Sequence, residues 1–380
     1  MWKVQLFELN YDQREEQAVE QVLKSRWITM GERTRTFEEA FGEYHGSPHL
    51  PTAVANCTAA LHMALLALDI GPGDEVIISG LTFIADANVV MMVGARPVLA
   101  DVTSMDDWNV SAETIAAKIT PRTKAVLLVH FGGVPCEMEP IIQLCQSRGL
   151  SLIEDVAHAP GAEYFGKKCG VFGDISCFSF FTNKNLSVGE GGMVICKDDK
   201  INAKIKFLRS HGMSTLTLDR HQGRAITYDV LQPGFNYRMD EMRAALGLVQ
   251  LQKLDEANRQ RELLAGQYSE LLADLEAIRI PFRQLTGRKS VFHIFPVLLS
   301  PSISREKLFH AMKDKGIQTS IHYPSLKSFS AYKEILAGSE TPNCDTICEG
   351  ELTLPLYPTM KAESVAFVSS GLRDSILEQL

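Results

Sequence analysis

Two ionisable side chains, a lysine and an aspartate, each follow an apolar run that is typical of a buried β-strand. Lys184 comes shortly after the run 175–181 and just before the glycine-rich turn 189–192, and Asp155 ends the run 151–155. A lysine amine forms a Schiff base with pyridoxal phosphate, and a carboxylate beside the pyridine nitrogen keeps that nitrogen protonated, so that the ring accepts electrons. Delivered from the ends of neighbouring strands, this pair suits a pyridoxal phosphate site.

A second motif offers a place for a phosphate group. Cys57 and Thr58 open an apolar-periodic helix directly after Asn56, a residue type favoured at helix N-caps. The backbone N–H groups at such a helix start, together with the positive end of the helix dipole, attract anions. Ser179 and Asn236 are further candidate phosphate ligands.

Two ring-bearing side chains follow other strand-like runs. Phe83 lies where a strand-like run ends and a helical segment begins, so its ring is placed to stack on a cofactor ring. His158 follows Asp155 by one short turn, where it would hydrogen-bond the acid or contact the cofactor. Because ligands of open α/β sheets gather outside the carboxyl ends of the strands, the order of these motifs predicts one shared site.

The elements that must position these residues alternate along the first two thirds of the chain. Apolar, β-branched runs alternate with amphipathic stretches at 58–68, 84–93 and 139–147, which predicts an α/β fold with a mostly parallel sheet flanked by helices. A long helix is expected at 240–275. A smaller α+β part follows it, with a strand at 291–299 and helices at 304–315 and 362–376. We therefore expect a large catalytic domain at 12–245 and a small domain at 246–380.

Composition excludes several functional classes. The chain has 380 residues, 45% hydrophobic and 22% charged, and its net charge of −8 offers no basic excess for nucleic acid. Its eight cysteines form no CxxC pair and no cluster with histidine, so neither a metal site nor a disulfide framework is indicated. The first residues lack the apolar core of a signal peptide, and no apolar run reaches the roughly 18 residues of a membrane span. We expect a cytoplasmic protein.

With these motifs in order, the chain resembles the sugar aminotransferases of the DegT/DnrJ/EryC1/StrS group. The resemblance extends from 27–31 to 354–358. The strongest matching segments are 71–77, 121–125, 153–159, 173–175, 178–185, 189–192 and 234–240. It implies the type I fold of pyridoxal phosphate-dependent transferases, as in aspartate aminotransferase.

The resemblance also assigns roles at the cofactor. It implies that Lys184 carries pyridoxal 5'-phosphate and that Asp155 pairs with the pyridinium nitrogen. Cys57, Thr58 and Ser179 would then bind the phosphate.

Further roles follow for the residues around the ring. Phe83 would stack on it, and His158 would lie near its hydroxyl. Asn236 matches the residue that reaches the phosphate of the neighbouring subunit, which implies a homodimer with shared active sites. Arg238 and His322 are the substrate-side candidates.

The implied reaction is a ping-pong transfer of an amino group from L-glutamate to a keto group of a nucleotide-linked deoxysugar. The chain departs from the family pattern at 129–133 and 325–328, segments that border the substrate site, so the substrate stays open. A cyclitol or another keto compound remains an alternative acceptor.

Three other functions compete with transamination. A sugar dehydratase of the same fold would carry histidine in place of Lys184. A cysteine desulfurase would need a reactive cysteine, for which Cys344 and Cys348 are the late candidates. A regulatory protein would not need the lysine and acid pair.

Overall fold

The computed structural model describes residues 1–215, 223 and 226–380. Within this part of the chain, seven strands form a central sheet in the order β1-β9-β8-β5-β4-β2-β3. β9 runs antiparallel to β1 and β8, and the other neighbours pair in parallel. The strands are β1 (Thr52–Val54), β2 (Glu75–Ser79), β3 (Arg96–Ala100), β4 (Thr123–Val129), β5 (Ser151–Asp155), β8 (Ile175–Ser179) and β9 (Gly192–Cys196). The mostly parallel α/β sheet expected from the sequence is confirmed.

Helices cover both faces of this sheet because its strands are apolar on both faces. Side chains of a strand alternate between faces, so Val76 and Ile78 of β2 join one hydrophobic cluster while Ile77 joins another. The first cluster includes α3 (Cys57–Ala67), α4 (Ile84–Met92) and α7 (Asp199–Arg209). The opposite face is covered by α5 (Ala112–Ala116), α6 (Met138–Arg148), α2 (Glu32–His45) and the start of α9 (Glu241–Leu271).

A smaller sheet lies beside the large one. Its order is β10 (Ile278–Arg279), β12 (Phe295–Leu299) and β13 (Glu351–Leu354), all antiparallel. Its core also takes side chains from α10 (Arg305–Asp314), α12 (Ala362–Leu377) and the second half of α9. Val4, near the N-terminus, packs into the same core. The remaining short elements are β6 (Glu163–Tyr164), β7 (Lys167–Lys168), β11 (Arg288–Lys289) and α11 (Pro342–Gly350).

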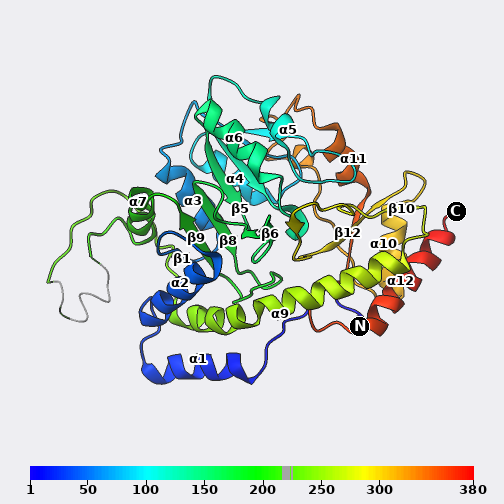
Figure 1. Cartoon of the computed structure of the whole chain (residues 1–380), viewed down its shortest axis with the longest axis horizontal. Helices are drawn as coiled ribbons and strands as arrows, with labels where there is room; N and C mark the ends of the chain where they lie inside the picture. The colour runs from blue at the N-terminus through cyan, green and yellow to red at the C-terminus, as the bar shows by residue number, and fades with distance from the viewer. Residues whose placement is uncertain (216–222, 224–225) are drawn as a thin grey trace.

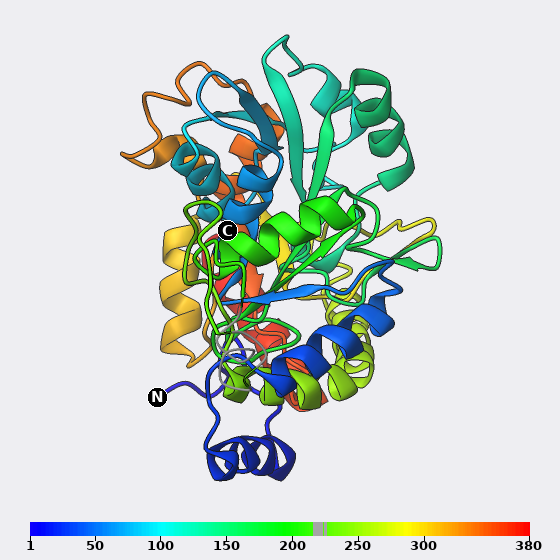
Figure 2. The same ribbon diagram turned by 90° about the vertical axis from the view of Figure 1, so that its left-hand side faces the viewer.

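One helix joins the two parts. α9 runs from the start of α2 to α12 along one side of the molecule (Figure 1), and its residues enter the hydrophobic clusters of both sheets. α1 (Gln13–Ser25) lies outside α9 and apart from the sheet (Figure 2), fixed by a 2.6 Å ion pair between Glu15 and Lys253. The boundary predicted between residues 245 and 246 falls inside α9, and the division into two domains stays a prediction.

The segment before β12 differs from the strand predicted at 291–299. Only Phe295–Leu299 pairs within the sheet. The backbone N–H groups of Val291 and His293 instead donate to the carbonyls of Gly133 and Gly132, at 3.0 and 2.9 Å. Residues 291–294 are apolar enough for a strand, but their hydrogen bonds go to the loop after β4, which brings His293 beside the large sheet.

Strand direction determines where functional side chains gather. The carboxyl ends of β1, β2, β4, β5 and β8 all lie at one edge of the sheet, and β9, running in the opposite direction, brings its first residue to the same edge. In the described part of the chain, no helix is long and apolar enough to cross a membrane.

Gly247 offers a test of the packing between α9 and α2. A Cβ atom at Gly247 would lie 2.6 Å from the ring of the fully buried Phe37, whereas nothing lies within 4 Å of one at Gly266 on the same helix. We expect Gly247→Ala to lower the free energy of unfolding by about 1–2 kcal/mol, because overpacking outweighs the gain in helix propensity. The control Gly266→Ala should raise it by about 0.5–1 kcal/mol. Denaturant unfolding measures both, and equal effects would contradict the packing.

Candidate active site

Lys184 lies in a short loop beyond the end of β8. Its backbone N–H donates to the carbonyl of Phe181 at 2.9 Å, and the loop is closed by a 3.2 Å bond from the hydroxyl of Thr182 to the carbonyl of Gly189. Burial lowers the pKa of the Lys184 amine to about 8, although the charge of Asp155 acts in the opposite direction. A substantial fraction of this amine is therefore neutral and nucleophilic near pH 8.

His293 holds the lysine amine. Its Nε2 lies 3.4 Å from the Nζ of Lys184, and its Nδ1 lies 3.0 Å from the amide oxygen of Asn185. The amide nitrogen of Asn185 donates to the carbonyl of Val291 at 3.0 Å, which fixes the orientation of the amide. Nδ1 of His293 therefore carries the proton, and its Nε2 accepts from Lys184. Sequence reasoning missed His293 because it interrupts an apolar run that reads as strand.

Asp155 ends β5, at the same edge of the sheet as the end of β8 that precedes Lys184. Its Oδ1 accepts a hydrogen bond from the backbone N–H of Ala157 at 2.8 Å, and the thiol of Cys57 lies 3.9 Å from the same oxygen. The side chain is buried, and burial raises its pKa, while the Ala157 N–H group and the charge of Lys184 favour the anion. An acid in these surroundings is suited to pair with a cationic ring nitrogen.

A second carboxyl group, Asp86 on α4, lies against Asp155. Asp86 is fully buried, its Oδ2 accepts a 2.5 Å hydrogen bond from the hydroxyl of Thr82, and its Oδ1 meets no donor in the described chain. Burial and the charge of Asp155 raise its pKa well above the usual range, so Asp86 is protonated beside Asp155. Its position in the first turn of a helix gave no signal in the sequence, because acids are common there.

His158 is buried between the two parts of the molecule. The backbone N–H of Gly132 donates to its Nδ1 at 3.3 Å, so its Nε2 carries the proton and lies 2.9 Å from the hydroxyl of Tyr323. Its ring lies 4.4 Å from the ring of His293. Burial and the charge of Lys184 lower its pKa, so His158 is neutral. It makes no hydrogen bond to Asp155, and its contact with the cofactor stays a prediction.

The start of α3 is a candidate anion site. Asn56 is the N-cap and accepts the N–H of Ala59 at 2.8 Å, while the N–H groups of Cys57 and Thr58 have no acceptor within the helix. Gly192 approaches this turn so closely that a Cβ there would lie 2.8 Å from the carbonyl carbon of Asn56. The lack of a side chain at Gly192 thus lets β9 pack directly against this turn. A phosphate bound at the helix start would meet the free N–H groups.

Other predicted residues lie around this edge. Ser179, the last residue of β8, is buried, and its hydroxyl accepts the N–H of Phe181 at 3.4 Å. The backbone of Arg238 pairs with Val54 at the end of β1, and its buried Nη1 has no partner in the described chain. Asn236 is exposed and makes no side-chain hydrogen bond within the described residues.

Phe83 and His322 lie towards the smaller sheet. Phe83 is the N-cap of α4, is 49% exposed, and its ring lies 5.5 Å from that of Tyr323. His322 is buried, and its ring lies 6.4 Å from that of His158. A half-exposed aromatic ring at the mouth of the site is available to stack on a ligand.

These groups fit pyridoxal phosphate. A neutral lysine amine and a buried acid lie at one edge, with free helix N–H groups and an unpaired arginine nitrogen. This donor set matches a ligand with an aldehyde, a basic ring nitrogen and a phosphate.

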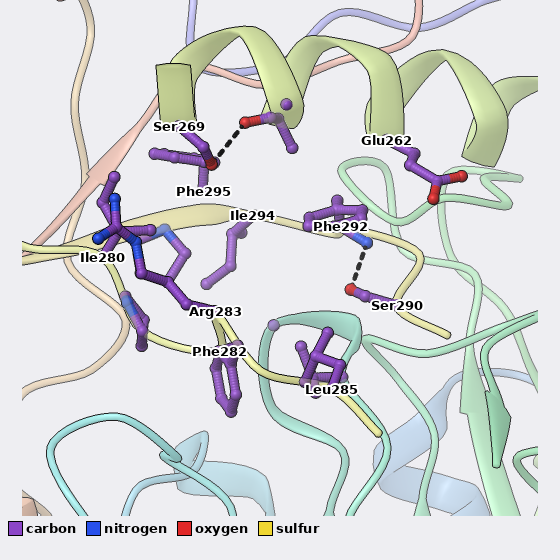
Figure 3. A pocket seen from close by; sticks show the side chains of 16 residues that line it. Glu262, Ser269, Ile280, Phe282, Arg283, Leu285, Ser290, Phe292, Ile294 and Phe295 are labelled. Carbon is purple, nitrogen blue, oxygen red and sulfur yellow. Dashed lines mark hydrogen bonds between the residues drawn. The ribbon is translucent and has the colours of Figure 1, made fainter. Parts of the chain in front are cut away.

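A well-defined cavity lies away from these residues. Figure 3 shows a cavity of about 440 Å³ between α9 and the segment that carries Phe282, Phe292 and Ile294. None of the predicted site residues lines it. Phe292 and Ile294 face this cavity, whereas His293 between them bonds to Lys184, so the segment separates the cavity from the site.

Comparison with known proteins identifies the family. The model of the DegT/DnrJ/EryC1/StrS aminotransferase family matches residues 10–373. The spore coat polysaccharide biosynthesis protein SpsC of Bacillus subtilis is 38% identical over 371 residues, covering 95% of this chain and 94% of SpsC. The aminotransferase TlmJ of Streptoalloteichus hindustanus has the same fold, with a TM-score of 0.91, 31% identity, and coverage of 100% of this chain and 99% of TlmJ.

A putative sugar aminotransferase from Streptococcus pneumoniae has been solved in PLP and PMP forms, and its PMP form gives a TM-score of 0.91 at 25% identity over 100% of both chains. The chain belongs to the DegT/DnrJ/EryC1/StrS aminotransferase family. It is a pyridoxal phosphate-dependent aminotransferase, as the sequence predicted.

The protonated state of Asp86 has a consequence for stability. Its folded pKa lies well above the 3.8 of a free aspartate, so the unfolded chain releases this proton at lower pH than the folded protein. The free energy of unfolding therefore loses this contribution as the pH rises above about 4. Asp86→Asn keeps the shape and the hydrogen bonds but cannot ionise.

We expect the stability of Asp86→Asn, relative to the unchanged protein, to increase between about pH 5 and pH 8. Denaturant unfolding of the cofactor-free protein at both pH values measures this difference. Asp69→Asn, at an exposed carboxylate, is the control. A difference for Asp86→Asn that does not change with pH would show that Asp86 is ionised in the folded protein.

Proposed function

We propose that this aminotransferase moves an amino group from L-glutamate to a keto group of a nucleotide-linked deoxysugar, with Lys184 as its catalytic amine. The observation that supports it most is the buried amine of Lys184, with its pKa lowered to about 8, on the same sheet edge as Asp155. The sugar class is supported by SpsC, which serves polysaccharide biosynthesis, and by the S. pneumoniae protein, a putative sugar aminotransferase.

Separate parts of the chain would hold separate parts of the cofactor. The N–H groups of Cys57 and Thr58, with the hydroxyl of Ser179, would bind the phosphate. Asp155, whose anion is favoured by the N–H of Ala157 and by the protonated Asp86, would hold the ring nitrogen in its protonated form. The bound cofactor supplies an electron sink that makes the Cα–H bond of an amino acid acidic.

Lys184 would move the proton in this reaction. Its neutral Nζ accepts the proton from the Cα of the amino donor, because a base with a pKa near the working pH transfers protons effectively in both directions. His293 accepts a hydrogen bond from Nζ and so aims the amine, while Phe83 would limit the motion of the ring.

The substrates would meet Arg238 and His322. Arg238 has a buried guanidinium nitrogen that meets no partner among the described residues, which suits a carboxylate of glutamate or a phosphate of the nucleotide. His322 is neutral, since burial and the charge of Lys184 lower its pKa to about 3, so it serves as a hydrogen-bonding group rather than as a cation.

The cysteines argue against a desulfurase. Cys344 and Cys348 are buried, and burial raises the pKa of both thiols, that of Cys348 to about 12. Such thiols are poor nucleophiles. All eight cysteines of the chain are free and buried, which fits work in a reducing compartment such as the cytoplasm.

We also propose a homodimer with shared active sites. Asn236 is exposed, and large apolar side chains near it or near Lys184 are exposed as well, among them Ile28, Phe181 and Leu231. The carbonyl of Ile28 accepts the first N–H of α9, so Ile28 lies close to the loop of Asn236. Exposed apolar side chains around an incomplete site favour a second copy as the covering surface.

Glutamate-dependent amination of keto-sugar nucleotides tests the reaction. We expect turnover with the unchanged protein and a loss of at least about a thousandfold for Lys184→Ala, which lacks the catalytic amine. Lys200→Ala, at an exposed lysine of α7, is the control and should remain active. Borohydride reduction and peptide mapping should place a pyridoxyl group on Lys184, and its recovery on another lysine would refute the assignment.

Mixing of two variants tests the shared site. We expect the protein to have twice the chain mass of 42.1 kDa in light scattering. Lys184→Ala and Asn236→Ala should each be impaired, because each lacks one group of every site. A mixed dimer should recover activity, since one of its sites pairs an intact Lys184 with an intact Asn236 of the other copy. A mixture that stays as inactive as its components would place Asn236 in the site of its own chain.

A further inference from the structure

Glu351, the first residue of β13, is a fully buried carboxyl group with few partners. Two groups hydrogen-bond to it, the backbone N–H of His322 at 2.7 Å from Oε2 and the hydroxyl of Thr353 at Oε1. Arg305 does not pair with its carboxylate and donates instead to the backbone carbonyls of Cys348 and Glu351, at 2.6 and 3.1 Å. No other side chain of the described residues forms an ion pair with it.

The buried Glu154 on β5 provides a comparison. It accepts hydrogen bonds from the N–H groups of Gly170 and Gly173, the hydroxyl of Ser176 and the imidazole of His130. These partners outweigh burial and lower its pKa to about 2.

At Glu351 burial prevails over the bonds from Thr353 and His322 and the charge of Arg305, and it raises the pKa to about 8. The other titratable groups around it are Tyr323 and Cys348, whose raised pKa values leave them neutral. Glu351 is therefore neutral at pH 7.

The three residues form a closed ring of hydrogen bonds. It runs from the backbone N–H of His322 to Oε2 of Glu351, from Oε1 to the hydroxyl of Thr353, and from that hydroxyl to Nδ1 of His322 at 2.8 Å. All three side chains are buried, so water does not compete for these bonds.

The protonation state of Glu351 decides which atoms donate and which accept in this ring of hydrogen bonds. A backbone N–H only donates, so Oε2 is an acceptor, and the proton of a neutral carboxyl group lies on Oε1. Oε1 then donates to Thr353, whose hydroxyl donates to Nδ1 of His322. In an ionised Glu351, Oε1 would accept from Thr353, and Nδ1 of His322 would have to donate. The same heavy-atom positions thus serve two tautomers of His322.

The ring of His322 lies near the candidate active site, 6.4 Å from the ring of His158. Nε2 of His322 has no hydrogen-bond partner among the described residues, and its ring lines a small space together with Asn183 and His293. Asn183 and His293 are the chain neighbour and the hydrogen-bond partner of Lys184. A ligand on Lys184 that extends into this space would find Nε2 of His322 as a hydrogen-bonding partner.

We propose that Glu351 and Thr353 are positioning residues that keep the proton of His322 on Nε2, so that this nitrogen donates a hydrogen bond to a carbonyl or carboxylate oxygen of the substrate. This inference rests on the proposed function, because the acceptor belongs to the keto compound or the amino acid. It adds two residues that do not touch the substrate and act through His322.

Three variants separate this role from a structural one. Thr353→Val keeps the shape of the side chain but breaks the ring. Thr353→Ser restores the hydroxyl. Glu351→Gln keeps the direction of the ring, because its amide oxygen accepts from the backbone N–H of His322 and its amide nitrogen donates to Thr353. Circular dichroism and the visible absorbance of the bound cofactor should be the same in all variants.

Nitrogen NMR of the holoenzyme with ¹⁵N-labelled histidine reads the tautomer directly, and His322→Gln identifies the signal. We expect the proton on Nε2 at about pH 7 in the unchanged protein, Thr353→Ser and Glu351→Gln, and a mixture of tautomers in Thr353→Val. A proton fixed on Nδ1 in the unchanged protein, or no change in Thr353→Val, would overturn the proposal.

Kinetics provide the second readout. We expect Thr353→Val to lower kcat/KM roughly tenfold, the effect of one lost hydrogen bond, with Thr353→Ser and Glu351→Gln close to the unchanged protein. As the pH rises through about 8, kcat/KM of the unchanged protein should fall below that of Glu351→Gln, because only the former ionises there. Titration of Lys184 affects both proteins alike.

A loss in Glu351→Gln as large as that in Thr353→Val would overturn the proposal. If the proposed function fails because the keto compound tested is not a substrate, the unchanged protein and all variants will show no turnover. The NMR signals will still report the tautomer of His322.

Discussion

Burial of ionisable groups at one edge of the central sheet is the constraint on which the rest of this structure depends. It lowers the pKa of Lys184 to about 8 and raises that of Asp155, while it keeps His158, His293 and His322 neutral. The histidines consequently act through the direction of their hydrogen bonds and not through charge. A lysine in the same loop but open to water would remain protonated, and the site would lose its nucleophile.

The carboxyl groups of this protein show that burial alone does not decide ionisation. Glu154 and Asp155 are adjacent on β5, yet they point to opposite faces and differ in pKa. Glu154 is surrounded by donors and ties the loop 170–173 to the sheet, which is a structural role. Glu351 accepts from one backbone N–H group and stays neutral, and burial together with the charge of Asp155 keeps Asp86 protonated. The number of donors that reach each carboxyl group separates these cases.

The active site also depends on contact between the two parts of the molecule. The large sheet provides Lys184, Asp155 and the helix start at Asn56, whereas His293 and His322 come from segments that lead into the small sheet. The backbone bonds from 291–294 to the loop after β4 connect the two, and α9 fixes their relative position. Motion between the two parts would change the distance from Lys184 to His293. The site therefore forms only when the large and the small sheet hold their relative position.

The sequence by itself determined the order of strands and helices and the mostly parallel sheet, and it predicted Lys184, Asp155 and the turn at Cys57 as site residues. These follow from local periodicity, from capping preferences and from side chains whose chemistry is distinctive. Only the tertiary structure revealed the surroundings of Asp86, His293 and Glu351. In the sequence, Asp86 reads as an ordinary acid in the first turn of a helix, His293 as a polar interruption of a strand, and Glu351 as a surface glutamate. Their protonation and their partners arise only when segments far apart in the chain meet and exclude water, and no local pattern encodes that meeting.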